Sequence, residues 1–259
     1  MIKSFDQLVC LSGLPRTGST LLSALLSQNP AIHAEGNSGL CQIMWDTQHS
    51  CNHSAKEELT ANSRLHSVND IVSQLPHSYY KGNSPQERIV VDKCRTWTLP
   101  NNLKMVDEFV GKDTKVVVLV RPIIEIVRSF VKVLKVNGRY TKEEERELFA
   151  PASDPLMRPL VALFEAQKDT SGRFLFVSYK SLVEDTAQTL KGIYNFCGWE
   201  QFIHNTNNVK PKYPENDSAY YLKGLHTVRK KVEYCDNHTE LMDETIQRCA
   251  ELDSALNLD

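Results

Sequence analysis

The sequence predicts an α/β protein with three layers, in which helices cover both faces of a central parallel sheet. Short apolar segments typical of buried strands alternate with longer segments whose apolar residues recur at helical spacing, and this alternation favours a parallel sheet. Residues 115–120 form a run of valine and leucine after one lysine, as expected for a strand buried on both faces. We find no internal repeat and no convincing linker, so we expect residues 1–259 to form a single domain.

The elements follow in order along the chain. A short apolar strand at 7–11 runs into a glycine-rich loop, and the leucines of residues 21–26 then repeat at helical spacing. Pro122 favours the start of a helix just after the run at 115–120. Further strands are expected at 88–91, 115–120 and 174–177, and helices at 103–110, 123–134, 181–196 and 239–256.

Three segments lack a clear strand pattern. Residues 33–85 are polar and irregular, and we expect one helix in them, around 56–75. Residues 205–233 are rich in Asn, Lys, Pro and Tyr and are expected to form a long structured loop, which in α/β folds is often a lid or a binding loop. The charged run at 142–147 is interpreted as the solvated face of a helix.

The composition argues against several classes of protein. Lys and Arg number 30 against 32 Asp and Glu, and a formal net charge of −2 argues against a general nucleic-acid-binding protein, which normally has a basic excess. The longest apolar runs are far shorter than the roughly 20 residues of a membrane-spanning helix. The first residues lack the apolar stretch of a signal peptide, so we expect a cytoplasmic protein. Seven scattered cysteines indicate free thiols rather than a disulfide framework.

A glycine-rich loop joins the first expected strand to the first expected helix. The run GLPRTGST at 13–20 has the two glycines of the nucleotide P-loop at the right spacing and keeps its final threonine, but Ser19 stands where that motif has lysine. Glycines allow successive backbone N–H groups to curl around an anion, and the helix N-terminus adds its dipole. A tight turn without a ligand is the alternative. The strand and helix on either side favour a site for a phosphate-like group.

A second anion site is expected where the strand at 115–120 ends. Arg121 follows that strand, and ligands of open α/β sheets bind at the carboxyl ends of strands. Ser129 comes about two helical turns later, near the same face of the helix. An arginine fork and a hydroxyl suit a second phosphate, although an Arg121 paired with an acidic neighbour fits the spacing as well. Since Arg121 stands where a metal–nucleotide enzyme would have aspartate, we expect no bound metal.

These segments resemble the sulfotransferases that use 3′-phosphoadenosine 5′-phosphosulfate (PAPS). Residues 14–20 are similar to the family's 5′-phosphosulfate loop, and Arg121 with Ser129 is similar to its 3′-phosphate motif. Residues 176–185 resemble the strand and Tyr-x-x-Leu segment that follow, in which the tyrosine lies near the adenine. Residues 224–230 resemble the basic loop that closes over the donor. The four segments stand in the family's order.

The resemblance implies a set of donor-binding residues. Two positions depart from the family pattern: Pro122-Ile123 replaces the usual Asp-Pro or Asn-Pro, and Leu21 stands where cytosolic members have tryptophan. By resemblance, the donor site consists of Pro15, Arg16, Thr17, Gly18, Ser19, Thr20, Arg121, Ser129, Tyr179, Leu225, His226, Thr227, Arg229 and Lys230.

The resemblance also implies three catalytic residues. Arg16 would serve the 5′-phosphosulfate, and Lys93 matches in context the lysine that several Golgi-type members place at the sulfuryl oxygens. Glu35 lies one or two positions from the catalytic glutamate of Golgi-type and some bacterial members, and a carboxylate there would take the acceptor's proton. His33 is the alternative base, because residues 93–97 lack the histidine that cytosolic enzymes use.

We therefore predict a PAPS-dependent sulfotransferase that transfers a sulfuryl group to a hydroxyl or amine and releases 3′-phosphoadenosine 5′-phosphate (PAP). The acceptor stays open among small molecules, sugars, lipids and peptides, and so does the oligomeric state. We expect no nucleic-acid partner and no membrane span. Two alternatives are a small-molecule kinase or nucleotide hydrolase with an altered P-loop, which would depend on a divalent metal, and a non-catalytic protein that binds PAP or PAPS.

Overall fold

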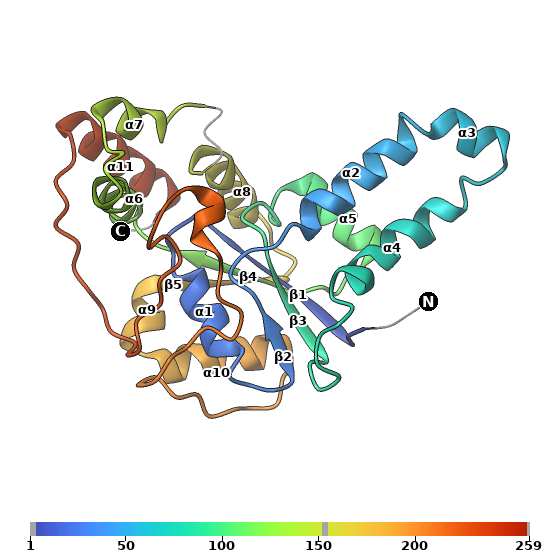
Figure 1. Cartoon of the computed structure of the whole chain (residues 1–259), viewed down its shortest axis with the longest axis horizontal. Coiled ribbons are helices and arrows are strands. Elements are labelled where there is room, and N and C mark those ends of the chain that lie inside the picture. The colour runs from blue at the N-terminus through green and yellow to red at the C-terminus, as the bar shows by residue number, and fades with distance from the viewer. Residues whose placement is uncertain (1–3, 152–154, 258–259) are drawn as a thin grey trace.

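A five-stranded parallel sheet forms the centre of the protein, in the order β2-β3-β1-β4-β5 (Figure 1). The structure, a computed structural model, describes residues 4–151 and 155–257. β1 lies in the middle of the sheet, so the loop that follows it is flanked by the ends of β3 and β4. The strands are β1 (Gln7–Gly13), β2 (Ile32–Ala34), β3 (Ile89–Lys93), β4 (Val116–Val120) and β5 (Phe174–Ser178).

Helices cover both faces of the sheet, which confirms the predicted three-layer α/β architecture (Figure 1). One face packs against α1 (Ser19–Leu26), α9 (Tyr179–Glu184) and α10 (Thr186–Cys197). The other packs against α2 (Leu40–Asn52), α4 (Ser67–Tyr79), α5 (Pro100–Phe109), α6 (Ile123–Val136), α8 (Met157–Gln167) and α11 (Asp243–Leu256). The shorter elements are α3 (Lys56–Ala61), α7 (Lys142–Glu147) and the 3₁₀ helix η1 (Asp217–Tyr220).

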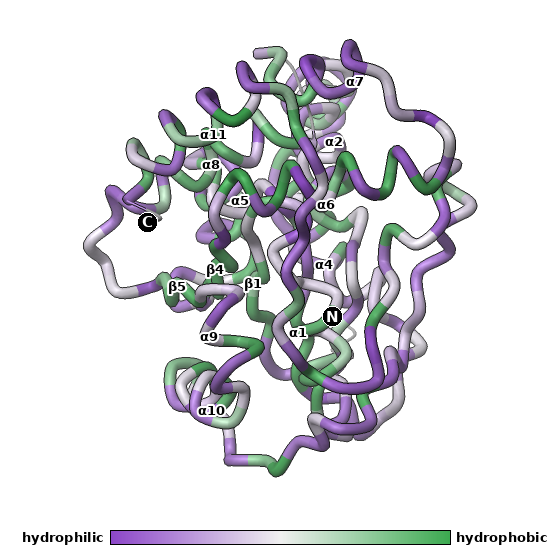
Figure 2. Tube along the Cα trace, turned by 90° about the vertical axis from the view of Figure 1, so that its left-hand side faces the viewer, coloured by the Kyte–Doolittle hydropathy of each residue, from purple (hydrophilic) through white to green (hydrophobic). Residues whose placement is uncertain are grey.

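Alternate side chains of the central strands pack into the two apolar layers, because successive side chains of a strand point to opposite faces of the sheet. In β1, Val9 and Leu11 join the cluster that contains α1 and α10, while Leu8 and Cys10 join the opposite cluster. The residues of β4 alternate between the two clusters in the same way. Because both faces of β4 are buried, every position in its valine run can be apolar. Figure 2 shows the apolar character of β1 and β4 in the interior.

The segment at 33–85 is more regular than its sequence suggests. The expectation of a single helix around 56–75 is wrong, because α2, α3 and α4 occupy this segment, and β2 stands at its start. β2 has only three residues, too few for a readable period, and it is held by parallel pairing with β3. α2 and α4 pack against each other and form the arm on the right of Figure 1.

Several helix boundaries differ from expectation. The helix expected at 181–196 is two helices, α9 and α10, which meet at Asp185. The backbone of Asp185 leaves the helical region, and its carboxylate caps α10 by accepting a hydrogen bond from the Gln188 amide. α11 begins at Asp243 rather than at residue 239, and α8 was not expected.

The charged run at 142–147 is not wholly a solvated face. It forms α7, but Glu145 is fully buried there. The Glu145 carboxylate accepts hydrogen bonds from the Tyr140 hydroxyl and the Met242 amide, each over 2.9 Å. A buried carboxylate with two donors ties α7 to the residues before α11.

The carboxyl ends of β1, β3 and β4 meet at one edge of the sheet. β1 ends at Gly13 and leads into the glycine-rich loop, β3 ends at Lys93, and Arg121 follows β4. Parallel pairing therefore brings the three strand-end features that the sequence singled out to one place.

The segment at 205–233 forms the expected long loop, with η1 as its regular element. Its two ends are held together by hydrogen bonds from the Val209 amide to the Lys230 carbonyl (2.7 Å) and from the Val232 amide to the Thr206 carbonyl (2.9 Å). Val209 is buried against the α1 side of the core, so the loop is anchored at its base.

The structure also bears on membrane-spanning helices and on the state of the cysteines. Across residues 4–151 and 155–257, no helix combines the length and the apolar character needed to cross a bilayer. All seven cysteines are free thiols, as their scattered positions suggested.

Gly13 ends β1 at a φ of +126°, and a Cβ there would overlap the Leu119 carbonyl oxygen of β4. Gly82 has nearly the same φ, +127°, but nothing lies within 4 Å of a Cβ built on it. We expect Gly13→Ala to lower the free energy of unfolding by about 1–3 kcal/mol more than Gly82→Ala, because only the first adds overlap to backbone strain. Urea denaturation of both variants measures the difference. Equal losses would contradict the close approach of β1 and β4.

Candidate functional site

A cavity of about 730 Å³ opens at the carboxyl ends of the strands. The β1–α1 loop, the end of β4, the second half of α6 and the segment at 205–233 all contribute to its wall. Its lining includes most of the predicted donor-site residues, namely Pro15, Arg16, Gly18, Ser19, Thr20, Arg121, Ser129, Tyr179, Leu225, His226, Thr227 and Arg229. The sequence-predicted binding residues therefore converge from four separate segments on one hollow.

Two of the predicted donor-site residues lie outside the lining. Thr17 is buried, and its hydroxyl donates to the Leu14 carbonyl over 2.7 Å, so it shapes the loop from within. Lys230 contributes its carbonyl to the base of the 205–233 loop, and the next residue, Lys231, lines the cavity in its place.

Arg16 joins the two predicted anion motifs. Its Nε donates to the Ser129 Oγ over 2.9 Å, and its Nη1 donates to the Leu225 carbonyl. Burial lowers the pKa of Arg16, and the charge of Arg121 lowers it further. None of the hydrogen-bond partners of Arg16 is a carboxylate, so an anion in the cavity would relieve this unfavourable burial of charge.

Arg121 is buried at the end of β4, with 8% of its surface exposed. Its Nη1 donates to the Arg16 carbonyl (2.9 Å), and its Nε donates to the Glu125 carboxylate (2.8 Å), so the acidic partner that the spacing allowed is present. The ring of Tyr179 lies 4.1 Å from the guanidinium carbon. A guanidinium has five N–H donors, and these contacts leave three of them for a ligand in the cavity that Arg121 lines.

Lys93 is the last residue of β3, is almost fully buried and lines the same cavity. Burial lowers its pKa to about 8, and the neighbouring charge of Arg95 acts in the same direction. The charge on Lys93 is therefore sensitive to pH just above neutrality and to any anion bound beside it.

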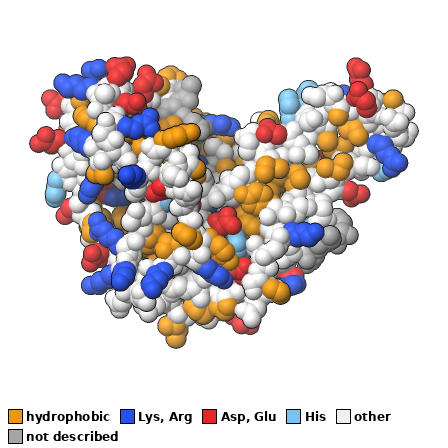
Figure 3. All heavy atoms as spheres, in the orientation of Figure 1, with side chains coloured by type: hydrophobic (Ala, Val, Ile, Leu, Met, Phe, Trp, Pro, Cys, Tyr) orange, Lys and Arg blue, Asp and Glu red, His pale blue; other side chains and the backbone are white. Residues whose placement is uncertain are grey.

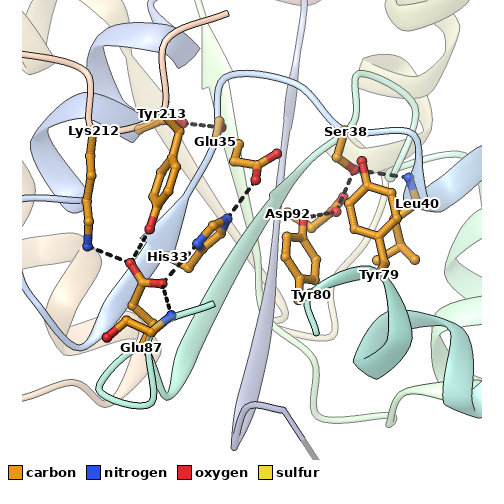
Figure 4. A network of polar contacts seen from close by, with 12 residues as sticks. His33, Glu35, Ser38, Leu40, Tyr79, Tyr80, Glu87, Asp92, Lys212 and Tyr213 are labelled. Carbon is orange, nitrogen blue, oxygen red and sulfur yellow. Dashed lines mark hydrogen bonds and ion pairs between the residues drawn. The ribbon is translucent and has the colours of Figure 1, made fainter. Parts of the chain in front are cut away.

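Glu35 follows the carboxyl end of β2 and belongs to a chain of polar contacts that leads to Glu87, just before the amino end of β3 (Figure 4). Its Oε1 lies 2.8 Å from the His33 Nε2, and the His33 Nδ1 lies 3.2 Å from the Glu87 Oε2. Burial raises the pKa of Glu87, but hydrogen bonds from Lys212, Tyr213 and His33 outweigh it and lower the pKa overall. Each ring nitrogen of His33 thus faces one carboxylate, and the tautomer of the ring decides which nitrogen donates.

The Glu35 side chain stands beside the cavity rather than in its wall. The next two residues, Gly36 and Asn37, line the cavity, while the Glu35 carboxylate faces His33 and is 32% exposed (Figure 4). The structure thus brings Arg16, Lys93 and Arg121 together in the cavity wall. Glu35 lies outside this wall, next to the lining residue Gly36.

A carboxylate that the sequence did not single out lies closer to Lys93. Glu215, from the 205–233 loop, packs so tightly against Gly36 that a Cβ there would overlap its Oε1. That oxygen is buried and makes no hydrogen bond, while Oε2 lies 3.5 Å from the His226 Nδ1. Burial raises the pKa of Glu215, and the charges of His226 and Lys93 oppose the rise. A buried carboxylate with a raised pKa is suited to accept a proton.

Sequence reasoning missed Glu215, Glu87 and Arg95. Arg95 follows the end of β3 by two residues and lines the cavity, so the strand-end argument used for Arg121 could have found it. Glu87 had no local signal, because its partner Lys212 lies 125 positions along the chain. The position of Glu215 depends on how the 205–233 loop packs over Gly36, and no sequence pattern predicts that packing.

Within the part of the chain that the structure describes, no group of three or more His, Cys, Asp or Glu side chains is placed to hold a metal ion. Arg16, Lys93, Arg95 and Arg121 are among the side chains that bring positive charge to the cavity wall.

Comparison with known proteins identifies the relatives of this chain. A profile described as the sulfotransferase family matches residues 9–203. A Caenorhabditis briggsae protein, provisionally named a protein-tyrosine sulfotransferase, is 19% identical over 229 residues, which make up 85% of this chain and 76% of that protein.

Solved sulfotransferase structures share the fold over nearly their whole length. The sulfotransferase domain from the curacin biosynthetic pathway superposes with a TM-score of 0.60 at 17% identity, covering 99% of each chain. The domain from the Synechococcus PCC 7002 olefin synthase gives 0.56 at 18% identity, covering 96% of this chain and 95% of that one. The enzyme from Alicyclobacillus acidocaldarius gives 0.56 at 13% identity, covering 100% and 98%.

Proposed function

This chain belongs to the sulfotransferase family, and we propose that it transfers a sulfuryl group from PAPS to a hydroxyl or amine and releases PAP. The donor would occupy the cavity of about 730 Å³ at the carboxyl ends of β1, β3 and β4. The matched segment, residues 9–203, includes the glycine-rich loop, Lys93, Arg121 and Ser129.

The contact between Arg16 and Ser129 is the observation that carries this proposal. It joins the proposed 5′-phosphosulfate loop to the proposed 3′-phosphate motif, which are 113 positions apart in the chain. PAP and PAPS carry two phosphate groups on one ribose, so a site for them needs two anion-binding motifs side by side. Three unused N–H donors of Arg121 supply the second motif with charge.

In the proposed reaction the acceptor oxygen or nitrogen bonds to sulfur while the bond between sulfur and the phosphate oxygen breaks. The products are the sulfated acceptor, PAP and one proton. Arg16 and the amides of the loop hold the phosphate, and Lys93 stabilises charge on the sulfuryl oxygens and the leaving phosphate. Positioning and charge stabilisation carry such group transfers, and these residues supply both without a metal.

The proton of the acceptor passes to a carboxylate in this proposal. Glu35 is the first candidate, because His33 and Glu87 extend behind it as a relay. The acceptor is a small molecule, sugar, lipid or peptide, and the name of the C. briggsae relative points to a tyrosine hydroxyl among these.

Arg121→Gln should weaken binding of PAP far more than binding of 5′-AMP, because Arg121 is proposed to hold the 3′-phosphate that 5′-AMP lacks. Charge-assisted hydrogen bonds worth about 1.5–3 kcal/mol correspond to a loss of roughly 10- to 150-fold for PAP. Calorimetric titration with both nucleotides measures the difference. Arg64→Gln, at an exposed position between α3 and α4, removes the same charge and should change neither affinity. Equal weakening of the two nucleotides in Arg121→Gln would end this assignment.

The value of kcat/KM for PAPS should fall as the pH rises through about 8, the pKa to which burial lowers Lys93. The ammonium is charged below that pKa and neutral above it, so its stabilisation of the donor is lost on the alkaline side. Lys93→Ala should lower kcat by about 10²–10³ and remove the alkaline limb. Lys93→Arg keeps its charge across this range, so its limb should also vanish. An alkaline limb that persists in both variants belongs to another group.

Glu35→Gln should lower kcat by roughly 10²–10⁴ and leave PAP affinity nearly unchanged, because an amide cannot take the acceptor's proton. Glu215→Gln is the matched comparison, since it makes the same change at the carboxylate beside Lys93. We expect the larger loss in Glu35→Gln. Steady-state kinetics with PAPS and a permissive acceptor decide between them. A normal kcat in Glu35→Gln with a large loss in Glu215→Gln would transfer the role to Glu215.

A further inference from the structure

A second cavity, of about 830 Å³, adjoins the donor cavity. Asn37, Arg95 and Tyr220 line both cavities, so the two meet at these residues. The Asn37 side-chain amide donates to the Tyr220 hydroxyl over 3.4 Å at this junction. Residues of α2, the start of α5 and the start of α8 form the remaining wall, and Figure 3 shows the surface hollowed between the arm and the lobe that carries α8. A molecule in the second cavity would reach the donor through the junction.

Among the described residues, the wall of the second cavity carries two arginines and no carboxylate. Arg95 comes from the end of β3 and Arg158 from α8, and none of the described lining residues is Asp or Glu. The Arg95 guanidinium makes no hydrogen bond or ion pair with any residue of the described ranges. Its charge instead lowers the pKa of the neighbouring Lys93. An anion beside Arg95 would therefore find a cation whose charge is not yet compensated.

The first turn of α5 adds to this positive field. Leu99, Pro100, Asn101 and Asn102 line the cavity, and α5 has neither a side-chain cap nor an acidic residue in its first turn. The helix has ten residues, so the partial positive charge of its N-terminus lies at the same wall as the two arginines.

Two carboxylates near this wall, Asp92 and Glu215, have partners other than Arg95. Asp92 lies behind the wall, where its two oxygens accept hydrogen bonds from Ser38 (2.5 Å), Tyr80 (2.6 Å) and Trp97 (2.7 Å) (Figure 4). Glu215 lies near the junction and faces His226 instead.

We propose that the second cavity is the acceptor site and that the acceptor carries a negatively charged group, such as a carboxylate or a phosphate, which Arg95 and Arg158 hold. This inference rests on the proposed sulfuryl transfer. The anionic group takes no part in the chemistry: the hydroxyl or amine at the Asn37–Tyr220 junction bonds to sulfur, the bond from sulfur to the phosphate of PAPS breaks, and the acceptor's proton passes to the carboxylate base. Acceptors of the same shape without a charge bind weakly.

The test compares two probes that differ only in charge, 4-hydroxyphenylacetate and its neutral amide. Each is titrated calorimetrically into the full-length chain saturated with PAP, so that the donor cavity is filled. The carboxylate should bind about 10- to 100-fold more tightly than the amide, the range for a charge-assisted contact. Arg95→Gln and Arg158→Gln should each reduce this preference, and the double variant should abolish it. Arg64→Gln, the matched charge control, should keep it.

Equal affinities for the two probes, or no binding of the carboxylate, would overturn the proposal. A loss of preference in Arg64→Gln as large as in Arg95→Gln would overturn it too, since net charge alone would then explain the effect. PAP affinity is measured first for every variant, which confirms folding. If PAP itself does not bind, the proposed function fails, and the carboxylate is titrated into the protein alone. A preference that depends on Arg95 would then still support an anion-binding cavity.

Discussion

Buried positive charge that has no carboxylate of its own is the feature on which this site depends. Arg16 is held by the Ser129 hydroxyl and the Leu225 carbonyl, which orient the guanidinium without neutralising it. Burial and the charge of Arg121 both disfavour its charged form, as the lowered pKa of Arg16 indicates. The folded chain tolerates this unfavourable arrangement because the apolar layers on both sides of the sheet fix the strand ends. An anionic ligand beside Arg16 would therefore favour the charged form of the guanidinium.

The loop at 205–233 connects the main cavity to the contacts around His33. Leu225 contacts Arg16, while Lys212 and Tyr213 hold Glu87, which in turn contacts His33. Any shift of the loop therefore changes the cavity wall and the His33 contacts together. The paired backbone at its base, between Val209 and Lys230, limits such shifts.

The sequence predicts the sheet well, and the segments it proposes as donor motifs meet at one cavity, because both are local patterns. The valine run of β4 and the GLPRTGST loop can each be recognised from a few consecutive residues. Helical spacing predicts that Arg121 and Ser129 lie near the same face. The sequence did not predict β2 or α2, and it predicted one helix where α3 and α4 lie. A three-residue strand has no readable period, and these helices carry many polar residues. Glu215 and Glu87 could not be predicted, since their roles come from partners that only the folded loop brings to them.

The pKa values of Glu87 and Glu215, two carboxylates that the 205–233 loop positions, are shifted in opposite directions, and this difference separates their roles. Glu87 accepts hydrogen bonds from Lys212, Tyr213 and His33, which lower its pKa and keep it ionised. Glu215 keeps one oxygen without a hydrogen bond, and burial raises its pKa. Carboxyl groups whose pKa values are pushed apart divide the acid–base work of a site between them. Glu87 thus anchors His33 as a fixed charge, whereas Glu215 and, on the other side of the His33 ring, Glu35 are the carboxylates proposed to take up the acceptor's proton.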